Sequence, residues 1–314
     1  MKKLLFGIFL AFLASACARP YNYSPLKSFS ELQYPYAVKH QQINDETQLA
    51  YMEEGPANAP VLLFIHGLGS YAPAWKQNIA ALSTQYRCIA IDLPGYGQSS
   101  KGAYSGSMTA FAAAVAKFIE AKQLGAVTVV GHSMGGQIAM TLAINRPELV
   151  QRLVLAAPAG FETFSPGEKE WFRTGLSAKG TRLTPARQIV QNYHGNFYNM
   201  PAEADFMIRD RLAMRTAAEF EWYCYIIPES VKGMVNEPVF NRMPEIKQPV
   251  LVVFGENDEL IPNRFMHGGT TRSVAEKGMA QLPNARLLMV PKAGHFVQFE
   301  GYRLFNEAVK DFVR

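Results

Sequence analysis

The chain has 314 residues, of which 48% are hydrophobic and only 18% are charged, and its formal net charge at pH 7 is +5. So small a charge, without a basic run or interleaved basic and aromatic residues, argues against binding to nucleic acid. The apolar content allows a sizeable core, and the length fits one large domain with an insertion.

Residues 1–17 have the composition of an export signal. Two lysines precede an apolar run over residues 4–13, and small residues then lead to Cys17. An apolar run of about ten residues is too short to span a bilayer as a stable helix. The basic start and the small-residue end favour a signal peptide over the alternative, a buried N-terminal helix. Its removal takes Lys2 and Lys3 away and lowers the net charge from +5 to +3.

The position of Cys17 resembles that of the lipidated cysteine in a bacterial lipoprotein signal. There the cysteine becomes the first residue of the mature chain and carries the lipid anchor. The family pattern usually has leucine three residues before the cysteine, whereas this chain has Ala14 there and Leu13 one residue earlier. Cleavage without lipidation, with release to the periplasm, is therefore the alternative. Because Ala18 and not aspartate follows the cysteine, the resemblance implies an outer-membrane lipoprotein of the bacterial cell envelope that faces the periplasm.

The next segment, residues 18–35, is rich in Tyr, Pro and Ser, and we expect it to be a tether. From Tyr36 the pattern becomes alternating. The stretches "YAVKHQQI" and "QLAYMEEG" flank a turn at Asn44-Asp45 and predict an antiparallel hairpin.

Apolar runs that read as buried strands then alternate with stretches of helical spacing. The expected strands are 61–67, 87–95, 127–133, 150–160, 248–262 and 286–300, and the expected helices include 72–86, 107–124, 134–147 and a closing helix to Arg314. Continuous apolar strands that alternate with helices are typical of a mostly parallel sheet with helices on both faces. The connections between its strands should be right-handed.

This alternation stops at about Phe161. Residues 161–245 contain many aromatic residues and helical stretches such as "PARQIVQNY", but no buried strand. The sequence therefore predicts an α/β core, made of residues 36–160 and 246–314, with a helical cap inserted at 161–245.

Gly131-His132-Ser133-Met134-Gly135 lies where a predicted strand meets a predicted helix. A Gly-x-Ser-x-Gly match alone is weak, but the strand-to-helix setting is the one that a nucleophile elbow requires. The glycines let neighbouring backbone approach a serine held in a strained conformation. The alternative is a serine that only caps the following helix.

A serine hydroxyl needs a base that takes its proton, and the base needs a carboxylate that fixes its tautomer. Among six histidines, His295 comes directly after the last strand, where it can lie over the carboxyl edge of the sheet. Asp258 ends the preceding strand, with Glu256 and Glu259 as alternatives. The chain order Ser133, Asp258, His295 is the order of one specific fold.

Acyl transfer also needs donors for the developing oxyanion. The backbone N–H of Met134, which follows the serine, is one candidate. His66-Gly67-Leu68-Gly69 follows a buried strand, and we expect the Leu68 N–H to be the second donor. The alternative is that this segment is only a glycine-rich turn.

From about Tyr36 to Arg314 the chain resembles the α/β-hydrolase superfamily. The resemblance rests on five motifs in order, "HGLGS" at 66–70, "DLPGYGQSS" at 92–100, "GHSMGG" at 131–136, "GENDELIP" at 255–262 and "AGHFVQFE" at 293–300. It implies a Ser133 acyl-enzyme, His295 as base and acid, Asp258 as its orienting carboxylate, and a helical cap over the site.

Within that superfamily the chain is similar to carboxylesterases, monoacylglycerol-lipase-like enzymes and carbon–carbon bond hydrolases. Serine at the elbow argues against haloalkane dehalogenases and epoxide hydrolases, which carry aspartate there. Aromatic cap residues, Phe161, Trp171 and Trp222 among them, suggest an apolar substrate pocket, although many must form the cap's own core. The leading hypothesis is therefore a serine hydrolase of carboxylic esters with an apolar acyl or alcohol part.

Two other hypotheses remain open. The same triad could cleave a carbon–carbon bond or an amide, or perform cofactor-free perhydrolysis, and the fold could also serve a ligand-binding protein with little turnover. No cofactor is expected, and no cysteine spacing typical of a zinc site occurs. Cys88 and Cys224 are expected to be small buried side chains and not a disulfide framework. The oligomeric state carries no sequence signal.

Overall fold

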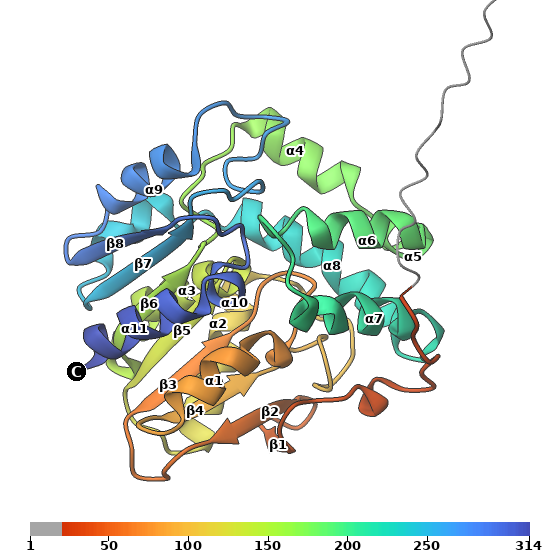
Figure 1. The fold of residues 1–314 in the computed structure, drawn as a ribbon, viewed down its shortest axis with the longest axis horizontal. Coiled ribbons are helices and arrows are strands. Elements are labelled where there is room, and N and C mark those ends of the chain that lie inside the picture. The colour runs from red at the N-terminus through yellow and green to blue at the C-terminus, as the bar shows by residue number, and fades with distance from the viewer. Residues whose placement is uncertain (1–20) are drawn as a thin grey trace, which may run out of the picture.

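The computed structural model of the chain describes residues 21–314, so the predicted signal peptide and Cys17 lie outside the described residues. Its central element is an eight-stranded sheet in the order β1-β2-β4-β3-β5-β6-β7-β8 (Figure 1). The strands are β1 Val38–Gln42, β2 Gln48–Glu54, β3 Val61–Ile65, β4 Arg87–Ile91, β5 Val127–His132, β6 Val150–Ala156, β7 Val250–Gly255 and β8 Ala285–Val290.

The pairing of the strands agrees with the sequence patterns. β1 and β2 form the predicted antiparallel hairpin, and β2 is also antiparallel to β4. The remaining neighbours are parallel, for example β3 with β5, where Ile65 lies opposite Gly131. All residues of β5 and β7 are buried, as expected for parallel strands that are covered on both faces.

Helices of the core flank the sheet, with α1 and α11 packed together and α2 and α3 packed together on the other face (Figure 1). The α-helices of the core are α1 Lys76–Leu82, α2 Met108–Ala121, α3 Met134–Asn145, α9 Thr271–Met279, α10 Val297–Glu300 and α11 Tyr302–Val313. The 3-10 helices of the core and the N-terminal segment are η1 Phe29–Glu31, η2 Ala72–Trp75 and η3 Pro147–Leu149. Cys88 and Cys224 are both buried and unpaired, as predicted.

In the segment predicted as a cap, residues 161–245, the structure has helices and no strand. The elements are α4 Pro166–Gly175, α5 Ala178–Leu183, α6 Ala186–His194, η4 Ala202–Ala204, α7 Asp205–Ala213, η5 Met214–Thr216, α8 Phe220–Asn236 and η6 Phe240–Glu245. Gln137 of α3 joins core and cap, because its side-chain amide donates to the carbonyls of Met234 (3.0 Å) and Glu237 (2.9 Å) near the end of α8. Among the residues from 21 onward, no helix has the length and apolar content needed to cross a membrane.

The segment before the hairpin is packed against the protein, so the prediction of a tether is wrong for its second half. Phe29 and Leu32 are buried in an apolar cluster with Phe220 and Tyr223 of the cap. The Tyr34 hydroxyl donates to the carboxylate of Asp92 at 2.5 Å. The Pro- and Ser-rich composition of the segment gave no indication of this packing. Two apolar side chains suffice to dock a short segment when the cap offers an apolar surface.

We expect Phe29→Ala to lower the free energy of unfolding by about 3 kcal/mol, because it empties a site that is only 1% exposed. Urea titration followed by circular dichroism measures this. Tyr23→Ala is the matched control, since Tyr23 belongs to the same segment but is 43% exposed. Equal stability of the two variants would show that the segment contributes nothing to the fold.

Candidate active site

Ser133 occupies a sharp turn between β5 and α3, with φ = 53° and ψ = −118°. This positive φ is rare for a residue with a side chain, and the surrounding backbone holds it. A Cβ on Gly131 would lie 2.3 Å from the Gly135 carbonyl oxygen, and a Cβ on Gly135 would lie 2.3 Å from the Ile65 carbonyl oxygen. Glycine is therefore required at both positions. The turn presents the Ser133 hydroxyl at the carboxyl edge of the sheet.

The structure brings together His295 and Asp258, which are 37 residues apart in the sequence. His295 Nδ1 donates to Asp258 Oδ2 at 2.8 Å, and both side chains are buried. The other oxygen of Asp258 accepts the N–H groups of Leu260 (2.8 Å) and Ile261 (3.1 Å). These bonds hold the carboxylate in place. The second ring nitrogen of His295, Nε2, takes no part in them and remains available to other groups.

The alternatives to Asp258 are engaged elsewhere. Glu256 forms an ion pair with Arg272 at 3.0 Å, and Glu259 forms one with Arg264 at 3.4 Å; both glutamates are exposed. Neither reaches His295 in a hydrogen bond among the described residues. The geometry therefore favours Asp258.

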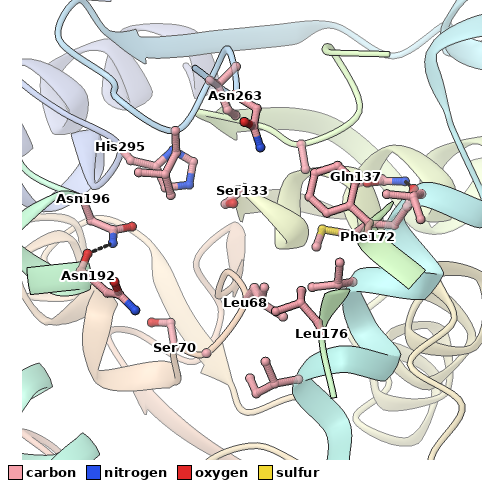
Figure 2. Close-up of a pocket in the computed structure, with 18 of the residues that line it drawn as sticks. Leu68, Ser70, Ser133, Gln137, Phe172, Leu176, Asn192, Asn196, Asn263 and His295 are labelled. Atoms are coloured by element: carbon pink, nitrogen blue, oxygen red, sulfur yellow. Dashed lines mark hydrogen bonds between the residues drawn. The ribbon is translucent and has the colours of Figure 1, made fainter. Parts of the chain in front are cut away.

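Ser133 and His295 both line one cavity, where Figure 2 shows the serine hydroxyl below the His295 ring. No hydrogen bond joins the two side chains in the described part of the chain. Such contacts are often long before a ligand binds.

The His295 loop is held by the cap. Glu300 accepts the Gly294 N–H at 2.8 Å and, from the cap, the N–H groups of Tyr198 (3.0 Å) and Asn199 (2.5 Å). Phe197 of the cap stacks on Phe296, with ring centroids 5.0 Å apart. The position of His295 therefore depends on the cap as well as on the sheet.

The glycine-rich loop after β3 lies directly beside the serine. A Cβ on Gly67 would be 3.1 Å from the Cβ of Ser133, and Leu68 lines the same cavity. His66 fixes the loop, because its Nδ1 donates to the Gly67 carbonyl (2.8 Å) and its Nε2 accepts the Leu93 N–H (3.1 Å).

Both predicted oxyanion donors have N–H groups available. The Met134 N–H is in the first turn of α3 and lacks an intrahelical acceptor, as helix starts do. It and the Leu68 N–H donate to no acceptor among the described residues. The arrangement can receive an oxygen anion formed next to Ser133.

Two further histidines near the serine are held in the neutral state. Burial lowers the pKa of His66 and lowers that of His132 well below the ordinary value. His132 Nε2 donates to the His295 carbonyl at 2.9 Å, and its ring packs between those of His295 and Phe296. Neither forms a hydrogen bond with a carboxylate among the residues from 21 onward, and their bonds to backbone groups are those of positioning residues.

The cavity has a volume of about 750 Å³ and lies between the sheet edge and the cap. One wall is a stripe on α8, made of Ile227, Val231, Met234 and Val235. This spacing places the four side chains on one face of a helix. Other walls come from α4, α6 and the loop after β7, including Phe172 and Leu176 (Figure 2).

The three predicted pocket residues do not line this cavity. Phe161 is 1% exposed and packs on Phe254 in the core, where it also meets Gly278. Trp171 and Trp222 are 55% and 41% exposed and face outward from the cap. These predictions were wrong because an aromatic residue in a cap can serve the core or the outer surface as readily as a pocket.

Arg211 of α7 is a wall residue that the sequence reasoning missed. It is buried, its guanidinium lies over the rings of Phe220 and Tyr223, and its Nη1 has no hydrogen-bond partner in the described part of the chain. The contacts with the two rings favour a charge at this place. A lone arginine among the many charged residues of the cap gave no signal in the sequence. The α8 stripe, by contrast, could have been found from its helical spacing.

Comparison with known proteins adds the family. The model of the family described as "alpha/beta hydrolase fold" matches residues 60–302. The dihydrolipoyllysine-residue acetyltransferase component of the acetoin cleaving system of Cupriavidus necator is 30% identical over 270 residues. That match covers 85% of this chain but only 66% of the relative's length, so about a third of the relative has no counterpart here.

Solved structures share the architecture. A probable hydrolytic enzyme from Pseudomonas aeruginosa has a TM-score of 0.81 at 24% identity and covers 92% of this chain and 99% of its own. A bacterial membrane phospholipase A has a TM-score of 0.72 at 25% identity, with coverages of 88% and 85%. Further matches are named as a carboxylesterase and as 2-hydroxy-6-oxononadienedioate hydrolases, so the family alone does not select the bond that is cleaved.

The neutral histidines predict how stability depends on pH. The unfolded chain binds protons on these side chains below about pH 6.5, whereas their lowered pKa values prevent this in the folded state. The contribution of the two neutral histidines to the free energy of unfolding is complete above about pH 6.5. It is lost progressively as the pH falls below that value. We expect His132→Asn to reduce the loss of unfolding free energy between pH 7.5 and 5 in urea titrations.

The asparagine amide keeps a donor for the His295 carbonyl. His40→Asn in β1 is the control, because it removes a histidine that lies outside the site. If the free energy of unfolding of His132→Asn falls with pH as steeply as that of the wild type, the lowered pKa of His132 is contradicted.

Proposed function

The chain belongs to the α/β-hydrolase fold family, and from this premise we propose that it is a serine hydrolase of carboxylic esters with an apolar acyl or alcohol part. The observation that carries the proposal is the hydrogen bond of Asp258 to His295, which lines the same cavity as Ser133. A nucleophile, a base and an orienting carboxylate are the groups that acyl transfer requires.

In the first step the Ser133 hydroxyl oxygen attacks the ester carbonyl carbon, while His295 Nε2 takes the hydroxyl proton. The negative charge that forms on the carbonyl oxygen is received by the N–H groups of Leu68 and Met134. Collapse breaks the bond to the alcohol oxygen, and the imidazolium returns the proton to that oxygen. Asp258 remains ionised throughout and stabilises the imidazolium.

In the second step a water molecule attacks the acyl-enzyme as His295 takes one of its protons. The same N–H groups receive the second oxyanion. Collapse breaks the bond between the acyl carbon and the Ser133 oxygen, and His295 returns its proton to that oxygen. The acid then leaves, and water is the only co-reactant.

The apolar α8 stripe and the size of the cavity support an apolar acyl or alcohol part. A cavity of about 750 Å³ accommodates a ligand well beyond an acetyl group in size. The resemblance to a bacterial membrane phospholipase A supports an ester as the scissile group. Hydrolysis of carbon–carbon bonds is the competing proposal, and the 2-hydroxy-6-oxononadienedioate hydrolases among the relatives favour it.

We propose a location in the bacterial envelope from the composition of residues 1–17. Lipidation of Cys17 would anchor the enzyme in the outer membrane, and cleavage alone would release it to the periplasm. Mass spectrometry of the mature protein distinguishes the two outcomes.

Ser133→Ala should abolish hydrolysis of p-nitrophenyl esters, because no other nucleophile occupies the turn. The assay runs from acetate to palmitate, and the chain length with the highest kcat/KM measures the usable length of the cavity. Adding a 2-hydroxy-6-oxo-dienoate tests the carbon–carbon alternative in the same series. Folded wild-type protein that hydrolyses the dienoate but none of the esters would overturn the ester proposal.

Asp258→Asn should lower kcat on the best ester on the order of ten-thousand-fold. An asparagine amide can donate to Nδ1 and so favours the tautomer that cannot accept the serine proton. Glu259→Gln is the matched control and should keep the wild-type rate, since Glu259 pairs with Arg264 on the surface. Comparable losses in both variants would argue against Asp258 as the orienting carboxylate.

A further inference from the structure

The outer surface of the cap exposes large apolar side chains. Trp171 of α4, Leu176 before α5, Leu183 of α5 and Trp222 of α8 are between 37% and 64% exposed. Both α4 and α5 pack against α8, and the ion pair of Arg182 with Glu221 (2.6 Å) joins the neighbours of Leu183 and Trp222. We call this surface of α4, α5, α6 and the start of α8 the cap face.

The cap face has an excess of basic residues. Its helices carry Lys169, Arg173, Lys179, Arg182 and Arg187 against Glu168, Glu170 and Glu221, and Arg173 and Arg182 are paired with two of these glutamates. Lys179 and Arg187 form no ion pair among the described residues, so their charges are not neutralised within the protein. Exposed tryptophan and leucine side chains among unneutralised basic groups complement an anionic lipid surface.

The described chain begins against this same part of the cap. The Tyr21 hydroxyl and His194 Nε2 of α6 lie 3.0 Å apart, and Tyr21 packs on the apolar cluster that contains Ile189. Figure 1 shows this end of the chain beside α5 and α6, whereas α11 and the C-terminus lie on the opposite side of the molecule. Tyr21 is four positions after Cys17 in the sequence, a reach of at most about 14 Å. A lipid on Cys17 would therefore hold the cap, and not the far side, next to the membrane.

The cavity reaches the surface of this region. Gly175, Leu176, Ser177 and Gly180 line the cavity and are also exposed to solvent. The cavity that contains Ser133 therefore borders the cap face between α4 and α5.

We propose that the cap face docks on an anionic lipid surface, so that the cavity opens towards the bilayer and takes its substrate from it. The docking rests on the cap face and on the place where the described chain begins, and only the nature of the substrate rests on the proposed function. The unneutralised basic charge and the start of the chain at α6 favour a lipid surface over a second copy of the protein, which would bring like charges together.

The tryptophans supply a direct test with the full mature chain. Trp75 is fully buried, whereas Trp171 and Trp222 lie on the cap face, so surface docking changes the environment of those two alone. Vesicles of phosphatidylcholine with phosphatidylglycerol should shift the tryptophan emission to the blue, and brominated acyl chains should quench it. Vesicles of phosphatidylcholine alone should give a smaller effect.

Lys179→Glu with Arg187→Glu should reduce this quenching at low salt. Arg303→Glu with Lys310→Glu on α11 is the matched control and should leave it unchanged. Flotation of the chain with anionic vesicles without tryptophan quenching would mean that only the N-terminal segment binds, and it would overturn the proposal. Equal quenching in both charge variants would overturn it as well.

A second readout uses ester delivered in two forms. Trp171→Ser with Leu183→Ser should lower the rate on a long-chain ester embedded in anionic vesicles by the order of tenfold, while the rate on a short soluble ester stays unchanged. Leu304→Ser on α11, where Leu304 is 46% exposed, is the control. Equal losses on both substrates would contradict docking.

Two results distinguish the lipid proposal from self-association of the protein and from the ester proposal. Self-association of the wild type without vesicles, lost in the Trp171 and Leu183 variant, would assign the cap face to a second copy and overturn the lipid proposal. If no ester is hydrolysed, the ester proposal fails, but the tryptophan quenching still decides whether the cap face docks.

Discussion

The close backbone approach around Ser133 is the constraint on which the site depends. Its positive φ is tolerated because β3, β5 and α3 meet there with no room for a side chain on Gly131 or Gly135. The carbonyl of Ser133 accepts the N–H groups of Gly136 and Ala159, and its own N–H donates to Ala156. Ser133 therefore cannot adopt another backbone conformation without displacing β3, β5 or α3. The backbone that carries the Ser133 side chain is therefore fixed before any ligand arrives, as the proposed role of Ser133 as the nucleophile requires.

The site depends on a second feature of the fold, because the cap and the sheet position its residues together. Gln137 links α3 to the end of α8, and Glu300 links the His295 loop to the cap at Tyr198 and Asn199. The cap therefore supplies the cavity wall and also part of the frame that holds His295. A displacement of the cap would therefore also displace the loop that carries His295.

The sequence could predict the elements whose signal is local. β5 and β7 are continuous apolar runs, and Ser133 stands between glycines at a strand-to-helix junction, so sheet and turn follow from short stretches. Asp258 and His295 follow from their positions after the last two strands. The structure places these two side chains together, while their catalytic roles remain proposals.

What the sequence could not predict depends on which surface an apolar side chain meets. Phe161, Trp171 and Trp222 look alike in a helical segment, yet one is buried in the core and two face outward. Phe29 lies in a stretch with the composition of a linker but fills a gap beside the cap. Only the α8 stripe had a periodic signal, since a helix that covers a cavity must present apolar residues on one face.

The three histidines around Ser133 show how environment separates roles among identical side chains. His66 and His132 are buried and bonded to backbone groups, so burial keeps them neutral and they hold loops in place. His295 alone has a carboxylate bonded to Nδ1. In the proposed mechanism, that bond leaves Nε2 as the proton acceptor and stabilises the ring when it gains a proton. A carboxylate beside His132 would not make that histidine a usable base. His132 Nε2 is already bonded to the His295 carbonyl and is not free to contact a substrate. The placement of one aspartate therefore distinguishes His295, the proposed base, from the other two histidines.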